Sequence, residues 1–143
     1  MPLRIIEHDS GEYRQMVELR DEILRSPLGL TFSNDDLAAE CKDILIAAFE
    51  EERMVACCVL TTEDPKSLRL RQMAVSKAVQ GKGVGRAMIR FAETVSRDHG
   101  YTKVTMHARS TAVGFYEKMG YKVCSPEFVE VTIPHYIMEK TLL

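Results

Sequence analysis

The sequence of 143 residues contains no apolar stretch long enough to cross a membrane as a helix. Its longest apolar runs, from Ile44 to Phe49 and from Met54 to Leu60, fall far short of the roughly 20 residues that a spanning helix needs. The N-terminal segment Met1–Arg4 also lacks the apolar region of a secretory signal peptide. We therefore expect a cytoplasmic protein that acts away from membranes.

A strong imbalance of charge is missing too. The chain has 19 Lys and Arg against 21 Asp and Glu, a formal net charge of -2 at pH 7, so electrostatics give no reason to expect nucleic acid or an anionic membrane as a partner. The hydrophobic share of 45% and the charged share of 28% are typical of a globular chain, and the length suits one domain. We predict a single domain that spans residues 1–143.

The cysteines form no C-x-x-C pair and have no histidine spacing typical of zinc sites. We therefore expect neither a bound metal nor a redox motif. Two cysteines are adjacent within an apolar run, so their side chains would point to opposite faces of a strand, and a disulfide between them would be strained. Buried core thiols are the preferred interpretation of all four, which are Cys41, Cys57, Cys58 and Cys124.

Three glycines stand close together in the segment QGKGVGR, residues 80–86, between an apolar run that ends at Val75 and a helical pattern that begins near Val84. Glycine lets the backbone approach a ligand closely and adopt positive φ, which leaves N–H groups free to point outward. The following helix adds its unpaired first-turn N–H groups and the positive end of its dipole. The segment predicts a site for a phosphate or pyrophosphate, with a glycine-rich surface turn as the alternative.

Two better-known phosphate motifs do not match this segment. A nucleotide-hydrolysing loop needs G-x-x-x-x-G-K-[ST], and no Lys-Ser or Lys-Thr pair follows the glycines. A dinucleotide fingerprint needs G-x-G-x-x-G, and Arg86 or Met88 stands where its third glycine belongs. Nucleoside triphosphate hydrolysis and dinucleotide binding are therefore disfavoured.

A second pattern, ARSTAVGFYEKMGY at residues 108–121, reads as a short helix that Gly120 ends. Together, Q-x-x-G-x-G at residues 80–85 and A-x-x-F-Y-x-x-x-G-Y at residues 112–121 resemble the GNAT superfamily of N-acetyltransferases. The resemblance covers residues 68–121. Within the superfamily, the chain resembles the small, single-domain bacterial members. It implies acetyl-coenzyme A (acetyl-CoA) as co-substrate, with no metal.

The remaining pattern agrees with an α/β (α+β) fold that has a mixed, mostly antiparallel central sheet flanked by helices, as the resemblance implies. Apolar runs and turn signals predict strands and helices in alternation, without a linker or repeat. The predicted strands are Leu3–Glu7, Ile44–Phe49, Val55–Thr61, Leu68–Val75, Lys103–Met106, Val129–Ile133 and Ile137–Lys140, the last two separated by Pro134 and His135. The predicted helices are Tyr13–Leu24, a short one from the N-cap Ser33 to Glu40, one from Val84 to Gly100, and the helix that ends at Gly120.

The resemblance also implies the residues that bind the co-substrate. The strand before the glycines would pair with the pantetheine arm, and the amide of Met73 would polarise the thioester carbonyl. Many members have an asparagine seven residues before the helix tyrosine, but this chain has Arg109, so that contact is lost or replaced by Ser110 or Thr111. The predicted cofactor-binding residues are Met73, Ala74, Val75, Gln80, Gly81, Lys82, Gly83, Val84, Gly85, Arg86, Ser110, Ala112 and Phe115.

Acetyl transfer to an amine needs a base for the ammonium and an acid for the departing thiolate. By resemblance, Tyr116 is the general acid, although aromatic spacing alone would favour a packing role. His107, Glu130 and His135 are candidates for the base, of which we select Glu130 and His135. A water relay to any of them is also compatible with the sequence.

The sequence says least about the amine that accepts the acetyl group. Period-two alternation places Glu130 and Thr132 on one face of the expected Val129–Ile133 strand, so Glu130 is either a solvated charge or part of the acceptor cleft. Together with Arg25 and with Phe32 at the end of an apolar loop, it would suit a small polar amine that bears a carboxylate, and a peptide amine stays open, as does a homodimer. A non-catalytic acyl-CoA sensor or partner-binding module is the alternative function.

Overall fold

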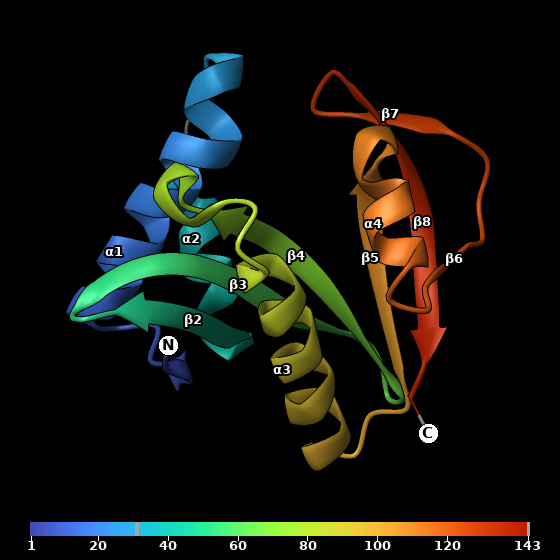
Figure 1. Ribbon diagram of the computed structural model, residues 1–143, viewed down its shortest axis with the longest axis horizontal. Helices are drawn as coiled ribbons and strands as arrows, with labels where there is room; N and C mark the ends of the chain where they lie inside the picture. Colours follow the sequence, from blue (N-terminus) through green and yellow to red (C-terminus); the bar gives the residue numbers. More distant parts are fainter. Residues whose placement is uncertain (31, 143) are drawn as a thin grey trace. The chain divides into compact units, whose positions relative to one another are not determined.

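The computed structural model describes residues 1–30 and 32–142, and the chain forms two compact units (Figure 1). The first comprises Met1–Thr61 and Arg71–Ala92, and the second comprises Thr62–Leu70 and Glu93–Leu143. Three elements run from one unit into the other, namely β3 (Arg53–Asp64), β4 (Ser67–Val75) and α3 (Val84–Asp98).

The first unit is an antiparallel sheet with short helices. Strand β2 is the middle of its β1–β2–β3 ladder, with register Leu3↔Ala48 on one side and Ile44↔Leu60 on the other. The side chain of Ser10 accepts a hydrogen bond from the N–H of Tyr13 and so caps α1. The elements that lie wholly in this unit are β1 (Leu3–Ile6), α1 (Gly11–Arg20), a π-helical turn (Asp21–Arg25), 3₁₀ turns (Ser26–Leu28, Ala39–Lys42 and Lys77–Val79), α2 (Asn34–Ala38) and β2 (Ile44–Glu50).

The core of this unit joins α1 to the sheet. Met16 and Leu19 of α1 pack in one apolar cluster with alternate residues of the strands, including Leu45 and Val59. Cys57 and Cys58 are fully buried, as predicted, and burial raises the pKa of Cys57 to about 12. The prediction of buried thiols is wrong for the other two cysteines, since Cys41 and Cys124 lie outside the strand interiors and are exposed.

The second unit combines one parallel ladder with antiparallel ones. Strand β4 pairs with β5 in parallel from Ser67↔Lys103 to Leu70↔Met106, and β8 pairs antiparallel with β5, β6 and β7. With the antiparallel ladders of the first unit, this makes a mixed, mostly antiparallel sheet with flanking helices, so the predicted fold class is confirmed. The elements wholly in this unit are β5 (Lys103–Arg109), a 3₁₀ turn (Ser110–Ala112), α4 (Val113–Glu117), β6 (Lys122–Val123), β7 (Phe128–Glu130) and β8 (Ile133–Thr141).

The predicted strand from Val129 to Ile133 is wrong. Val131 and Thr132 instead form a tight turn between β7 and β8, with φ of 51° and 63°. Two-residue hairpin turns favour Asn and Gly, and β-branched residues rarely adopt positive φ, so the sequence carries no signal for this turn. Pro134 lies inside β8 rather than between strands, and its missing N–H is tolerated because the pairing of β8 with β5 begins one residue later, at Arg109↔His135.

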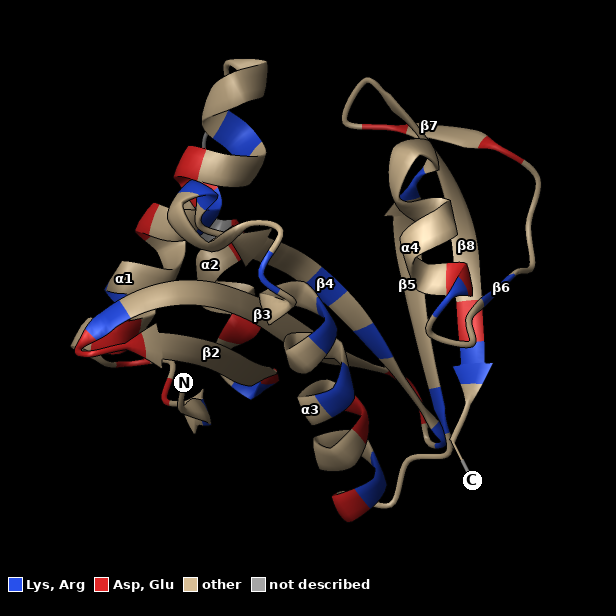
Figure 2. Cartoon of the chain, viewed as in Figure 1, with Lys and Arg blue, Asp and Glu red and all other residues tan. Residues whose placement is uncertain are grey.

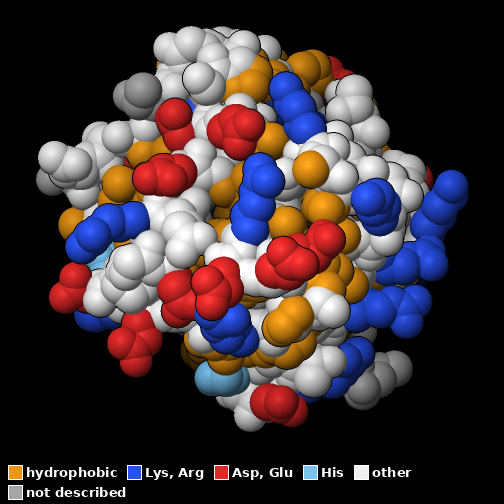
Figure 3. All heavy atoms as spheres, turned by 60° about the vertical axis from the view of Figure 1, so that its left-hand side comes forward, with side chains coloured by type: hydrophobic (Ala, Val, Ile, Leu, Met, Phe, Trp, Pro, Cys, Tyr) orange, Lys and Arg blue, Asp and Glu red, His pale blue; other side chains and the backbone are white. Residues whose placement is uncertain are grey.

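The remaining predicted helices and strands are present, but β3 and β5 extend beyond the predicted ends of Val55–Thr61 and Lys103–Met106. The glycine segment joins β4 to the first turn of α3, and Val84 and Met88 of α3 are buried. Gly100 and Gly120 end their helices at φ of 85° and 96°. Acidic and basic side chains are both spread along the chain (Figure 2), and on the face drawn in Figure 3 they lie interspersed with apolar ones. None of the helices in the described part of the chain has the length and apolar character needed to cross a membrane.

Candidate functional site

The glycine segment presents open backbone at the start of α3. Gly81 and Gly83 have φ of 80° and 79°, and a Cβ atom on either would meet nothing within 4 Å. The side chain of Gln80 donates to the carbonyl of Val75 at 3.0 Å and so ties the two ends of the connection together. The first N–H groups of α3, from Val84 onward, have no acceptor within their own helix. The residues present therefore fit a bound pyrophosphate.

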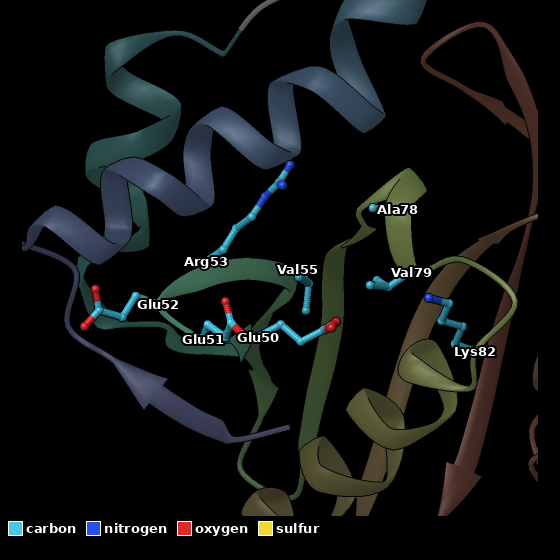
Figure 4. Close-up of a pocket in the computed structure, with 8 residues that line it drawn as sticks. All are labelled: Glu50, Glu51, Glu52, Arg53, Val55, Ala78, Val79 and Lys82. Atoms are coloured by element: carbon cyan, nitrogen blue, oxygen red, sulfur yellow. The ribbon is translucent and has the colours of Figure 1, made fainter.

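A hollow of about 800 Å³ lies beside this segment in the first unit (Figure 4). Lys82, Val79 and Ala78 line it on one side, and the β2–β3 turn lines it on the other (Figure 4). That turn carries three consecutive carboxylates, Glu50–Glu52, which repel a phosphate. The hollow is thus a poor site for coenzyme A, and the open N–H groups of the glycine segment are the better one.

Tyr116 lies on α4 with its side chain mostly buried, 9% exposed. Its ring meets the edge of Phe115 at 5.1 Å and of Tyr121 at 5.9 Å between centroids. Phe115 itself is 42% exposed, so one ring of the group stays open to a ligand. The N–H of Tyr121 donates to the carbonyl of Tyr116 at 3.1 Å, which closes the helix through the left-handed Gly120.

A buried polar group holds the end of this helix. The hydroxyl of Tyr121 donates to Glu93 of α3 at 2.8 Å, and Nζ of Lys140 lies 3.1 Å from both oxygens of Glu93. Lys140 also donates to the carbonyl of Met119 at 2.9 Å. Burial and the neighbouring Glu93 raise the pKa of Tyr121, so its proton stays in place. These contacts fix the position of Tyr116, and no sequence motif indicated them.

The three base candidates lie together on the other side of β8. Because side chains alternate along a strand, His135 and Lys140 point to opposite faces, and Glu130 of β7 lies on the face of His135. Oε1 of Glu130 is 3.0 Å from Nδ1 of His107, and Oε2 is 3.8 Å from Nε2 of His135. The sequence left Glu130 as either a solvated or a cleft carboxylate, and the structure places it between two imidazoles.

The tautomer of His135 follows from its hydrogen bond. Nδ1 lies 2.7 Å from the carbonyl oxygen of Ile133, which can only accept, so Nδ1 carries the proton. In the neutral ring the lone pair is then on Nε2, the atom that faces Glu130. The ring is 6% exposed and stacks on Phe128 at 5.9 Å between centroids, which fixes its orientation.

The charge of Glu130 is stabilised by its surroundings. Burial alone would raise the pKa of this carboxyl, but the hydrogen bond of His107 and the positive charges of His107, Arg69 and His135 lower it below its usual value. Arg69 was not predicted, although the alternation of Leu68, Arg69 and Leu70 along β4 places it on the polar face beside β5. Within the described residues, no group of three or more His, Cys, Asp or Glu is arranged to hold a metal ion.

The two predicted acceptor residues meet in the first unit. The guanidinium of Arg25 lies over the ring of Phe32 at 4.6 Å, and that of Arg20 lies over the same ring at 4.5 Å. Arg20 is fully buried and forms two hydrogen bonds to Glu40, at 2.7 and 2.8 Å. Glu130 belongs to the second unit, so a pocket shared by Arg25, Phe32 and Glu130 stays a prediction.

The predicted cofactor residues are likewise divided. Those from Met73 to Arg86 lie in the first unit, whereas Ser110, Ala112 and Phe115 lie in the second, on the 3₁₀ turn and α4. Each group is where its motif predicts, with the first at the end of β4 and the start of α3. Their joint action on one ligand also stays a prediction.

Comparison with known proteins identifies the class. The model of the acetyltransferase (GNAT) domain family matches residues 31–142. The chain therefore belongs to the GNAT acetyltransferase family, as the two sequence motifs indicated.

Individual relatives agree with this assignment. A Bacillus subtilis (strain 168) protein named "Putative acetyltransferase BSU40680" is 32% identical over 134 residues, which are 93% of this chain and 88% of that protein. An acyl-CoA N-acyltransferase from Pseudomonas aeruginosa has the same fold, with a TM-score of 0.85 and 17% identity over 97% of this chain and 98% of that one. An aminoglycoside 6'-N-acetyltransferase solved with coenzyme A has a TM-score of 0.84 and 13% identity, over 100% and 98% of the two chains.

Proposed function

We propose that this protein transfers the acetyl group of acetyl-CoA to a primary amine by direct attack of the amine on the thioester. The observation that carries this proposal is the Glu130 carboxylate, ionised and held between the imidazoles of His107 and His135. A carboxylate attracts an ammonium group, and an imidazole beside it can take the ammonium proton. This is the chemistry that turns an unreactive ammonium into a nucleophile.

The base step follows from the tautomer of His135. Its Nε2 carries the lone pair in the neutral ring and faces Glu130, so a proton from an ammonium bound to Glu130 moves to Nε2, directly or through one water. The imidazolium that forms then lies 3.8 Å from a carboxylate, which stabilises its charge. Glu130 thus binds the acceptor, and His135 accepts its proton.

The acid step is assigned to Tyr116. As the amine nitrogen bonds to the acetyl carbon, the carbon–sulfur bond breaks, and the phenol proton passes to the departing sulfur. The nitrogen then loses its surplus proton to solvent, and the phenol regains one from solvent, so that the products are the amide and the free thiol. The rings of Phe115 and Tyr121 and the hydrogen bonds of Glu93 and Lys140 hold the helix end in one position. A fixed phenol is what proton transfer to a developing thiolate needs.

Coenzyme A would bind mainly through backbone. The exposed edge of Met73–Val75 would pair with the pantetheine arm, and the amide of Met73 would polarise the thioester carbonyl. The open backbone at Gly81 and Gly83 and the first turn of α3 would hold the pyrophosphate, with Lys82 and Arg86 as nearby cations. The predicted cofactor residues outside this segment, Ser110, Ala112 and Phe115, would contact the coenzyme from the second unit.

The acceptor is proposed to be a small polar amine that also bears a carboxylate. Arg25 supplies a cation for that carboxylate, and Phe32 supplies an apolar surface beneath the guanidinium. The named acceptors of structural neighbours differ widely: one acts on an aminoglycoside and another on the alanine of a ribosomal protein. The fold therefore does not select the acceptor, and a peptide amine remains the second candidate class.

The test is release of free thiol from acetyl-CoA with a library of amines, read together with product masses. We expect acetylated product from at least one amine that carries a carboxylate. The alternative function, an acyl-CoA sensor without turnover, requires tight binding of acetyl-CoA and no product from any amine or peptide. That result would overturn the proposed function.

A further inference from the structure

Nδ1 of His107 lies within hydrogen-bond distance of two groups with opposite demands. Nη2 of Arg69 is 2.8 Å from it, and Oε1 of Glu130 is 3.0 Å from it. A guanidinium nitrogen only donates, and an ionised carboxylate oxygen only accepts. Nδ1 can accept a hydrogen bond from Arg69 only when it carries a lone pair, and it can donate one to Glu130 only when it carries a proton. The two hydrogen bonds therefore exclude each other.

We propose that Arg69 is a positioning residue which, by donating to the unprotonated Nδ1 of His107, frees Glu130 to bind the ammonium group of the acceptor. This inference rests on the proposed function. In the competing state His107 carries a proton on Nδ1, donates it to Glu130 and repels Arg69. Glu130 then accepts a hydrogen bond from the protein itself and binds an ammonium less well. In the proposed state, by contrast, Nη2 of Arg69 lies 3.9 Å from Oε1 of Glu130, beyond hydrogen-bond distance, and donates to His107 instead.

The sheet imposes this competition. Arg69 pairs with Thr105 in the parallel β4–β5 ladder, and His107 is two residues further along β5 on the same face. The side chains of Arg69 and His107 are 28% and 22% exposed, so solvent screens their contact only in part. The ring of Phe128 meets His107 edge-on at 5.3 Å between centroids and limits its rotation. The imidazole of His107 thus stays between Arg69 and Glu130.

Among the described residues, the other charged or titratable groups on the face of His107 come from its own strand and from the other strands of the second unit. Glu139 of β8 shares the face but pairs with Lys103 at 3.4 Å, and Glu63 of β3 accepts from the hydroxyl of Thr105 at 3.1 Å. The groups on this face are Glu63 on β3, Arg69 on β4, Lys103 and Arg109 on β5, Lys122 on β6, Glu130 on β7, and His135 and Glu139 on β8. Only Arg69 and Glu130 have a described hydrogen bond to Nδ1 of His107.

The test measures directly which nitrogen of the His107 imidazole carries the proton. The chain has four histidines, so long-range proton–nitrogen NMR of histidine-labelled protein resolves each ring, with His107→Gln for assignment. In the wild type we expect neutral His107 to carry its proton on Nε2. Arg69→Met keeps an unbranched apolar side chain but removes the donor and the charge, and it should move the proton of the neutral His107 ring to Nδ1.

Arg69→Lys is the matched control, since it keeps a cationic donor and should keep the wild-type tautomer. His8 and His99 serve as internal references that neither substitution should change. The same tautomer of His107 in the wild type and in Arg69→Met would overturn the proposal. So would a wild-type ring with its proton on Nδ1.

Kinetics provide a second, independent measurement. With an accepted amine, Arg69→Met should raise the KM for the amine by about tenfold, while the affinity for acetyl-CoA stays unchanged. Equal losses toward both substrates would indicate a merely structural role and contradict the proposal. If the wild type acetylates no amine, the proposed function fails, and the NMR comparison still decides whether Arg69 sets the state of His107.

Discussion

Nε2 of His135 faces Oε2 of Glu130 at 3.8 Å because Nδ1 of the same ring is held by the carbonyl of Ile133. The backbone of the β7–β8 hairpin thereby determines which nitrogen of the ring is basic. The carboxylate of Glu130 and the lone pair on Nε2 of His135 therefore face each other.

Glu130→Gln and His135→Ala should each lower kcat/KM for the amine by about 10²-fold, because one removes the charge that binds the ammonium and the other removes the base. The affinity for acetyl-CoA, measured by titration of the intact protein, should stay close to the wild-type value. Val129→Ala serves as the control on the same hairpin, since this side chain is 71% exposed. Wild-type amine kinetics in both variants would place the acceptor site elsewhere.

Tyr116→Phe keeps the ring packed against Phe115 and Tyr121 and removes the hydroxyl group that carries the acidic proton. We expect the turnover rate to fall by about 10²-fold, with acetyl-CoA binding nearly unchanged. Phe115→Leu, on the same helix, should instead weaken acetyl-CoA binding. A turnover rate within a few-fold of the wild type across the pH range would show that Tyr116 only packs.

Gly83→Ala places a methyl group in the open space where the pyrophosphate is expected, at a backbone φ of 79°. The left-handed conformation should cost about 1–2 kcal/mol of stability, and the KM for acetyl-CoA should rise about tenfold or more through lost N–H contacts. Gly11→Ala is the matched control, since its Cβ also meets nothing within 4 Å and its φ is not positive. A lower melting temperature with unchanged acetyl-CoA kinetics would remove the basis for the phosphate site.

Arg20→Met should destabilise the protein by about 3–5 kcal/mol in urea unfolding, because it leaves the buried Glu40 carboxylate without its guanidinium. Adding Glu40→Leu should restore much of this loss, since both charges are then gone. If Arg20 and Glu40 contributed independently, the losses in the free energy of unfolding of the two single variants would instead add in the double variant.

The same pair predicts a pH dependence. Burial opposes the charge of Glu40, but hydrogen bonds from Arg20 and Tyr13 and the charges of Arg20 and Arg71 lower its pKa below 4.5. A lowered folded pKa contributes stability above the unfolded value, and this stability is lost as the pH falls through the folded pKa. The difference between wild type and Arg20→Met should therefore be full at pH 7 and shrink below about pH 4.5.

The sequence by itself determined the features that depend on local chemistry. Glycines at positions 81 and 83 mark a backbone with positive φ before a helix, Gly120 marks a helix end, and the apolar run around Cys57 marks a buried strand. Each of these signals acts through a residue and its immediate neighbours, so one sequence suffices to predict it. The motif pair built on them also identified the family.

Tertiary structure decided the hairpin and the base cluster. Val131 and Thr132 are strong strand formers, yet contacts on both sides, from Glu130 to His107 and from His135 to Ile133, hold them in a turn. Local preference predicts a strand there because it contains no information about a partner 23 residues away along the chain. Arg69, His107 and Glu130 meet for the same reason, since strand pairing between β4, β5, β8 and β7 brings distant residues onto one face.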